Sequence, residues 1–156
     1  MHKKYKIHEL ITYQDIDATN IPYENYFDII VFKSIIGGIG RNNNIAIQKK
    51  TFNEIYKALK PGGKLLFAEN LAGSSFHQFL RRKFVKWGKS WRYISLNEYK
   101  TFFSSYKNYE VKATGMIALF GRSEWQRNAL AIIDRLILNH ICPDNWKYIS
   151  FGIAEK

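Results

Sequence analysis

Ionisable and polar side chains follow the second of two apolar runs in the middle of the chain. Glu69 and Asn70 come directly after the run at 64–68, and His77 follows shortly afterwards. A histidine can act as a general base near neutral pH, and an ionised carboxylate accepts hydrogen bonds. A histidine beside Phe76 is, however, more often a packing or surface residue than a base. Glu69 and His77 are therefore weak candidates for catalysis.

Aromatic and basic side chains are interleaved in the segment 74–95. They are Arg81, Arg82, Lys83, Phe84, Lys86, Trp87, Lys89, Trp91, Arg92 and Tyr93. Such a segment could cap an anionic or sugar-bearing substrate, lie on a membrane surface or stack bases. The simpler interpretation is an amphipathic helix with an apolar stripe and a solvated basic face. If the segment is a substrate lid, Asn70, Arg82 and Trp91 are weak candidates for substrate contacts.

The sequence lacks several other chemical motifs. Cys142 and the four histidines have no metal-ligand spacing, and no Ser-His-Asp or Gly-x-Ser-x-Gly arrangement occurs. Gly37-Gly38-Ile39-Gly40 follows a predicted strand, but Asn43 stands where a dinucleotide fingerprint needs its third glycine. We interpret this stretch as a close-packed loop, with a phosphate or cofactor cradle as the alternative. No metal site is predicted.

A strand–helix–strand unit over residues 27–70 must position these side chains. The apolar, β-branched run at 27–32 is typical of a strand buried on both faces. Helical spacing follows over 42–60, and the Pro-Gly-Gly turn at 61–63 ends that helix. The second apolar run completes a βαβ unit, whose crossover is right-handed in nearly all cases.

The sequence pattern in the rest of the chain predicts further helices and strands, and we expect a single domain over 1–156. Helices are predicted over 76–87, 96–106 and 123–137, the last two starting at capping boxes. Strands are predicted over 109–117 and 146–154, and a weaker one over 9–17. No repeat or low-complexity linker divides the chain.

Composition restricts the class of protein. The chain has 156 residues, of which 46% are hydrophobic and 16% aromatic, and this excludes disorder. The single Cys142 fits a reducing compartment, and no signal peptide or membrane span is recognisable, so a cytoplasmic location is expected. The net charge of +11 indicates either a polyanionic partner or a general bias toward lysine, and we favour the bias.

Three groups of residues occur in the order found in a known family. They are Asp17-Ala18 with Ile21-Pro22, then Phe27-Asp28, then Leu59-Lys60-Pro61-Gly62-Gly63. They resemble the C-terminal half of class I S-adenosylmethionine-dependent methyltransferases, of the type 11-like group. The resemblance implies an α/β fold with helices on both faces of a Rossmann-like sheet, whose family order is 3-2-1-4-5-7-6. The first two strands have no counterpart here, and the seventh would be antiparallel.

The resemblance also implies S-adenosylmethionine as cofactor and assigns residues to it. Asp17 would accept a hydrogen bond from the adenine amino group, with the Ala18 backbone beside it. A turn-forming role is the alternative for this aspartate. Phe32, Lys33 and Ser34 would line the cofactor pocket at the end of the fourth strand, close to Asp17 at one edge of the sheet. The family's glycine-rich turn and ribose-binding carboxylate are absent, so the isolated chain is expected to bind the cofactor weakly or not at all.

The first functional hypothesis is methyl transfer from S-adenosylmethionine to a small-molecule acceptor, with this chain as the C-terminal part of the enzyme. One alternative is a non-catalytic remnant or interaction module that keeps the half-fold. A weaker alternative is a basic nucleic-acid-binding module. Because the fourth strand would lack its neighbour, its open edge is expected to pair with a partner chain or a second copy.

Overall fold

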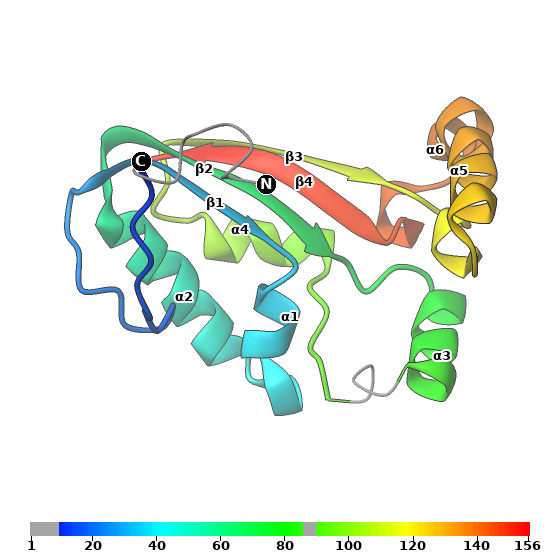
Figure 1. The fold of residues 1–156 in the computed structure, drawn as a ribbon, viewed down its shortest axis with the longest axis horizontal. Coiled ribbons are helices and arrows are strands. Elements are labelled where there is room, and N and C mark those ends of the chain that lie inside the picture. Colours follow the sequence, from blue (N-terminus) through cyan, green and yellow to red (C-terminus); the bar gives the residue numbers. More distant parts are fainter. Residues whose placement is uncertain (1–9, 86–89) are drawn as a thin grey trace.

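The computed structural model describes residues 10–85 and 90–156 of the chain, as an α/β fold (Figure 1). Its sheet contains β1 (Phe27–Lys33), β2 (Leu59–Asn70), β3 (Asn108–Thr114) and β4 (Ile149–Glu155). The α-helices are α1 (Ile36–Ile39), α2 (Ile45–Ala58), α3 (Ser75–Phe84), α4 (Tyr99–Phe102), α5 (Glu124–Ile133) and α6 (Asn139–Ile141). A π-helical turn, Asp134–Leu138, joins α5 to α6, and short 3-10 turns lie at Arg41–Asn43, Leu96–Glu98, Ala118–Phe120 and Asp144–Trp146. The predicted lid residues Lys86, Trp87 and Lys89 lie outside the described part.

The strands are ordered β1-β2-β4-β3 across the sheet. β1 and β2 are parallel, with Val31 opposite Leu66, whereas β4 is antiparallel to both of its neighbours. In the family order these are strands four, five, seven and six. The predicted fold class, a Rossmann-like methyltransferase sheet without its first two strands, is therefore confirmed.

The prediction of a strand over 9–17 is wrong for the part of this segment that the structure describes. Residues 11–17 have no strand geometry, and Leu10 and Tyr13 are 85% and 77% exposed. The physical reason is the mostly polar composition of this segment, which gives it no apolar face to bury against a sheet. Consequently β1 has β2 on one side and no strand on the other among the described residues.

The hydrophobic core lies between the sheet and the pair of helices α2 and α4 (Figure 1). Phe32 of β1 and Phe67 of β2 stack with ring centroids 5.9 Å apart. Phe52 of α2 stacks on Phe102 of α4 at 4.9 Å. These aromatic contacts fix the helices against the sheet, and each such pair contributes about 1 kcal/mol beyond its buried area.

The opposite face of the sheet is exposed at several apolar side chains. Val31 is 70% exposed, and Ile29, Leu66 and Phe151 are also exposed. β1 was predicted to be buried on both faces; this is wrong for the described chain because helices α2 and α4 cover only one face. Helices α5 and α6 stand beyond the end of the sheet, at the right of Figure 1, rather than over β1.

The helix boundaries follow local capping interactions. Helix α2 begins later than predicted, because Asn44 caps it by accepting a hydrogen bond from the Ile47 amide at 3.1 Å. The capping boxes at Ser95 and Ser123 are both present. Gly62 has a φ of 74°, as expected for the turn that leads into the apolar part of β2. Among the described residues, no helix has the length and apolar character needed to cross a membrane.

Candidate functional site

The carboxyl ends of β1 and β2 lie side by side. Lys33 is opposite Ala68 in the parallel register, and the Ser34 amide donates to the Ala68 carbonyl at 2.8 Å. Glu69 and Asn70 follow directly on β2. Ser34 has a φ of 54°, so the chain turns sharply where it leaves the sheet. The structure therefore brings together candidate residues from two strands at the edge where open α/β sheets bind ligands.

Glu69 is buried and fully engaged with the backbone. It is 1% exposed; its Oε2 accepts from the Ile36 amide at 2.9 Å and its Oε1 from the Asn70 amide at 2.8 Å. Burial raises the pKa of Glu69, while hydrogen bonds from the Asn70, Ile36, Ile35 and Gly37 amides act in the opposite direction. The carboxyl group thus joins the end of β2 to the start of α1, which makes it a positioning group in this structure.

His77 is likewise enclosed by partners. Its Nδ1 lies 2.6 Å from the Ser74 hydroxyl, and its Nε2 lies 2.6 Å from the Met116 carbonyl. A carbonyl only accepts, so Nε2 carries the proton and Nδ1 accepts from the Ser74 hydroxyl. The ring also stacks on Phe120 with centroids 5.5 Å apart. These contacts favour the packing interpretation of His77 over the catalytic one.

Asp17 lies in a turn beside helix α2. Its Oδ1 accepts from the Thr19 amide at 2.8 Å and from the Thr19 hydroxyl at 2.9 Å, which is an Asx turn. The Thr19 amide lowers the pKa of Asp17, as does the positive charge of Lys50 on α2. Four residues later, the Ile21 amide donates to Glu54 of α2 at 2.9 Å. Within the described residues, no hydrogen bond or ion pair joins Asp17 to Lys33 or Ser34, and the adenine-binding role of Asp17 stays a prediction.

A cavity of about 280 Å³ lies between α3 and the segment 91–93, next to the first residues after β2. We call it the basic cavity; its lining includes Asn43, Gln78, Arg81, Arg82, Trp91, Arg92 and Tyr93. It contains Arg82 and Trp91, two of the three residues predicted to contact a substrate, whereas Asn70 is not part of its lining. The sequence did not single out Gln78, Arg81, Arg92 or Tyr93 as site residues. The interleaved basic and aromatic pattern was the only signal for the last three.

One wall of the basic cavity is fixed by a polar network. Arg92 donates from Nη1 to Gln48 Oε1 at 2.6 Å and from Nε to Asn43 Oδ1 at 3.2 Å, and it forms an ion pair with Glu98. The buried Gln48 amide donates in turn to the carbonyls of Ile36 and Arg92, at 2.9 and 3.0 Å. The segment 91–93 is thereby attached to both α1 and α2.

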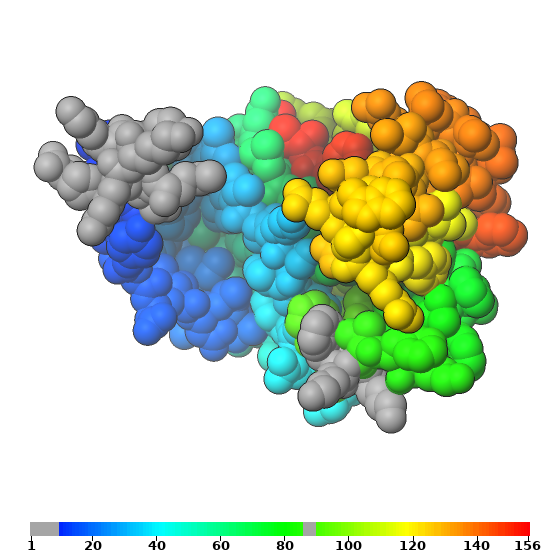
Figure 2. All heavy atoms as spheres, turned by 45° about the vertical axis from the view of Figure 1, so that its right-hand side comes forward, coloured from blue at the N-terminus to red at the C-terminus, as the bar shows by residue number. Residues whose placement is uncertain are grey.

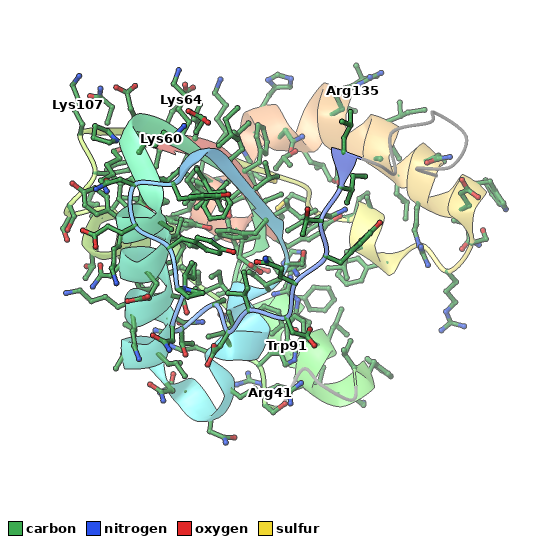
Figure 3. The ribbon with its side chains drawn as sticks, turned by 60° about the vertical axis from the view of Figure 1, so that its left-hand side comes forward. Arg41, Lys60, Lys64, Trp91, Lys107 and Arg135 are labelled. Carbon is green, nitrogen blue, oxygen red and sulfur yellow. The ribbon has the colours of Figure 1, made fainter. Side chains whose placement is uncertain are left out.

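The glycine-rich stretch at residues 37–40 packs against the same wall of the basic cavity. A Cβ at Gly37 would lie 3.0 Å from the Trp91 ring, and one at Gly40 would lie 2.2 Å from Gln48 Nε2. The stretch thus contacts Trp91 and Gln48 closely, in agreement with its interpretation as a close-packed loop. Figure 3 shows Trp91 and Arg41 near the start of α2, whereas Lys60, Lys64 and Lys107 gather at the opposite end of the sheet.

A second, mainly apolar hollow of about 490 Å³ lies on the exposed face of the sheet. Val31 and Lys33 of β1, Leu66 of β2 and Phe151 of β4 contribute to its lining. In the described parts of the chain, no group of three or more histidine, cysteine or acidic side chains is arranged to hold a metal ion. Three features are thus considered as sites of function: the strand ends, the basic cavity and this exposed face.

Comparison with known proteins connects this geometry to a family. A family model described as "Methyltransferase domain" matches residues 1–67, which include β1, α2 and most of β2. No curated protein matches the chain significantly. Among solved structures, the phosphoethanolamine N-methyltransferase 2 of Haemonchus contortus, in complex with phosphomonomethylethanolamine and S-adenosylhomocysteine, is 21% identical with a TM-score of 0.58. That alignment covers 97% of this chain and 39% of the Haemonchus chain.

Two further structures show how broad the likeness is. The N-methyltransferase NodS of Bradyrhizobium japonicum WM9, in complex with S-adenosylhomocysteine, is 14% identical with a TM-score of 0.55. The [4+2]-cyclase SpnF is 14% identical with a TM-score of 0.58. Each alignment covers 99% of this chain and 59% of the other. At these identities the likeness shows the fold, and the predicted resemblance to part of the class I methyltransferase fold is confirmed.

Proposed function

We propose that the chain is the C-terminal, acceptor-facing part of an S-adenosylmethionine-dependent methyltransferase that acts on a small molecule. The observation that carries this proposal is the strand order β1-β2-β4-β3 with parallel β1 and β2, together with the basic cavity that Ala72 lines just after β2. The methyltransferase match over residues 1–67 supports the same function.

We infer that the described residues would hold part of the cofactor. When bound, S-adenosylmethionine supplies an activated methyl group to a nucleophilic oxygen, nitrogen or carbon. Phe32, Lys33 and Ser34 would line its pocket at the end of β1, and Asp17 and Ala18 would contact the adenine. Glu69 keeps the chain after β1 in place through its backbone hydrogen bonds. In methyl transfers that need no protein base, the positioning of nucleophile and electrophile accounts for much of the catalysis.

The open edge of β1 would then pair with another polypeptide strand, and the partner would also cover the exposed sheet face. Val31 and Ile29 are exposed there, and an apolar strand edge is a template for pairing with another chain. We place the complex in the cytoplasm, which agrees with Cys142 as a free thiol among the described residues. The added strand would come from a second copy of the chain or from a separate protein.

Isothermal titration with S-adenosylmethionine and S-adenosylhomocysteine tests the proposal, with ATP as a control that shares the adenosine. We expect weak binding of both sulfur-containing ligands and still weaker binding of ATP, which shares the adenosine but lacks the methionine end. Heats equal to those of dilution for all three ligands would instead favour a non-catalytic interaction module. Phosphorylated amines belong among the acceptors in a methyl-transfer assay, since the Haemonchus complex contains one.

Two other functions are kept as alternatives. SpnF has this fold and is described as a cyclase, so the fold by itself does not fix the reaction. The net charge of +11 would suit a nucleic-acid-binding module. Binding to unrelated oligonucleotides that weakens steeply with salt would support that module, because it reflects the release of counterions from phosphates.

A further inference from the structure

Arg81 is a buried cation without a carboxylate partner among residues 10–85 and 90–156. It is 6% exposed; its Nη1 donates to the carbonyls of Leu71 and Ala72, and its guanidinium lies 4.2 Å from the centroid of the Tyr93 ring. Burial lowers the pKa of Arg81, because the charged guanidinium is less stable away from water. Carbonyl groups and an aromatic ring compensate a buried charge less well than an anion does.

The basic cavity adds a second cation whose charge is not neutralised by the described residues. Arg82 is exposed, lines the cavity beside Arg81 and forms no ion pair within the described chain. Arg92, the third arginine of the lining, is already neutralised by Glu98. The cavity therefore has a positive charge at its buried end, from Arg81, and another at its rim, from Arg82.

The neutral lining groups supply further hydrogen-bond donors. The Tyr93 hydroxyl can donate a hydrogen bond, and burial raises the pKa of this phenol. Among the described residues, Gln78 Nε2 makes one long contact of 3.4 Å, to the Gly73 carbonyl, and thus remains able to donate more strongly elsewhere. Both side chains line the same cavity as the two arginines.

We propose that the basic cavity binds the phosphate group of a small phosphate monoester. Four donor side chains on α3 and in the segment 91–93 suit a tetrahedral group with three acceptor oxygens, and guanidinium groups are well matched to phosphate. A volume of about 280 Å³ fits a small molecule, not a polymer. The further step of identifying this phosphate monoester with the methyl acceptor rests on the proposed function. The proposal that the cavity binds phosphate is independent of that function.

Substitutions at neighbouring positions of α3 test the proposal. Arg82→Gln and Lys83→Gln each remove one positive charge from an exposed position, but Arg82 lines the cavity and Lys83 does not. The full-length chain is titrated with inorganic phosphate, with O-phosphoethanolamine and with acetate, at constant ionic strength. We expect both phosphates to bind and Arg82→Gln to weaken them about tenfold, whereas Lys83→Gln changes the affinity less than twofold.

A second measurement reports on Arg81, whose replacement could unfold the chain. The arginine Nε–H resonances, observed by NMR in the unsubstituted protein, should shift for Arg81 and Arg82 when phosphate is added. Those of Arg122 and Arg135, which lie outside the cavity, should not shift.

Three outcomes would overturn the proposal. They are equal weakening by Arg82→Gln and Lys83→Gln, acetate binding as tight as phosphate binding, and phosphate shifts spread over all arginines. Phosphate binding without any binding of S-adenosylmethionine would leave this inference standing and overturn the proposed function. Binding of S-adenosylmethionine without binding of phosphate would overturn this inference and leave the proposed function standing.

Discussion

At the scale of single residues, the main finding is that buried charged groups near the strand ends hold the backbone in place. Glu69 accepts hydrogen bonds from the Ile36 amide, at the start of α1, and from the Asn70 amide, at the end of β2. Asp134 accepts hydrogen bonds from the Met116, Ile117 and Ala118 amides after β3. Each carboxylate satisfies amides that would otherwise be buried without partners. Arg81 differs from both, because its charge meets only carbonyls and an aromatic ring.

Replacing Glu69 with glutamine tests the positioning role of the carboxylate. The NH2 group of Gln cannot accept a hydrogen bond, so one amide donor, at Ile36 or at Asn70, would lose its partner. We expect Glu69→Gln to lower the free energy of unfolding by about 2 kcal/mol, as for a buried group left unsatisfied. Urea denaturation measures the change. Glu110→Gln, on an exposed strand, is the control and should change the stability by less than about 1 kcal/mol.

The ion pair between Arg92 and Glu98 should make stability depend on pH at the acidic end. Burial acts to raise the pKa of Glu98, but hydrogen bonds from Arg92 and Ser95 outweigh it, and the net shift is downward. A lowered pKa in the folded state means that the stabilisation is present above the ordinary value and is lost as the pH falls through the lowered one. Glu98→Gln should therefore be less stable than the original chain at pH 6 to 8, by about 2 kcal/mol.

The same difference should shrink below about pH 4. Denaturation at a series of pH values checks this. A stability difference that is constant down to pH 3 would show that the charge of Glu98 contributes nothing.

At the scale of elements, the wall of the basic cavity depends on close approach at the glycine-rich stretch. Gly40→Ala would place a methyl group 2.2 Å from Gln48 Nε2 and displace the amide that holds the Arg92 carbonyl. We expect this variant to lose about 2 kcal/mol of stability and to bind phosphate more weakly. Gly38→Ala, whose Cβ would lie 3.4 Å from Trp91, is the matched control and should be tolerated. If both variants behave alike, the contact with Gln48 is unimportant.

The sequence predicted the elements well where periodicity, caps and turns agree. The βαβ unit, both capping boxes and the order of the strands are as expected. The exposure of β1 was not predictable, because an apolar run has the same pattern whether or not a neighbouring layer covers it. The basic cavity was only partly predictable, since the burial of Arg81 depends on the path of the chain between α3 and Tyr93.

At the scale of the whole molecule, apolar surface is concentrated on two sides. Figure 2 shows side chains of α5 and α6 standing forward above α3; Trp125, Ile132 and Leu136 of this region are exposed. The second side is the exposed sheet face around Val31. Apolar surfaces of this kind mark interaction sites or promote aggregation.

Sedimentation velocity at several concentrations tests whether the chain associates through the sheet face. We expect the average mass to rise with concentration, and Val31→Lys to suppress the rise because a charge is unfavourable in an apolar face that becomes buried on association. Asn53→Lys, at an exposed polar position of α2 outside both apolar sides, adds the same charge as a control and should leave the association unchanged. A monomer at all concentrations, with a cooperative melt, would contradict the prediction.

The central claim is that the ends of β1 and β2 form part of a site for S-adenosylmethionine. Backbone amide NMR during titration with S-adenosylmethionine tests it most directly, by comparing the original chain with Asp17→Asn and with Asp15→Asn. We predict shifts at Asp17, Ala18 and Phe32–Ser34, with a dissociation constant on the order of 1 mM because the family's glycine-rich turn and ribose-binding carboxylate are not found in this sequence. Asp17→Asn keeps one oxygen acceptor but loses the negative charge, so it should weaken binding and reduce the shifts, whereas Asp15→Asn should keep them. Shifts elsewhere, or none at millimolar ligand, would contradict the account.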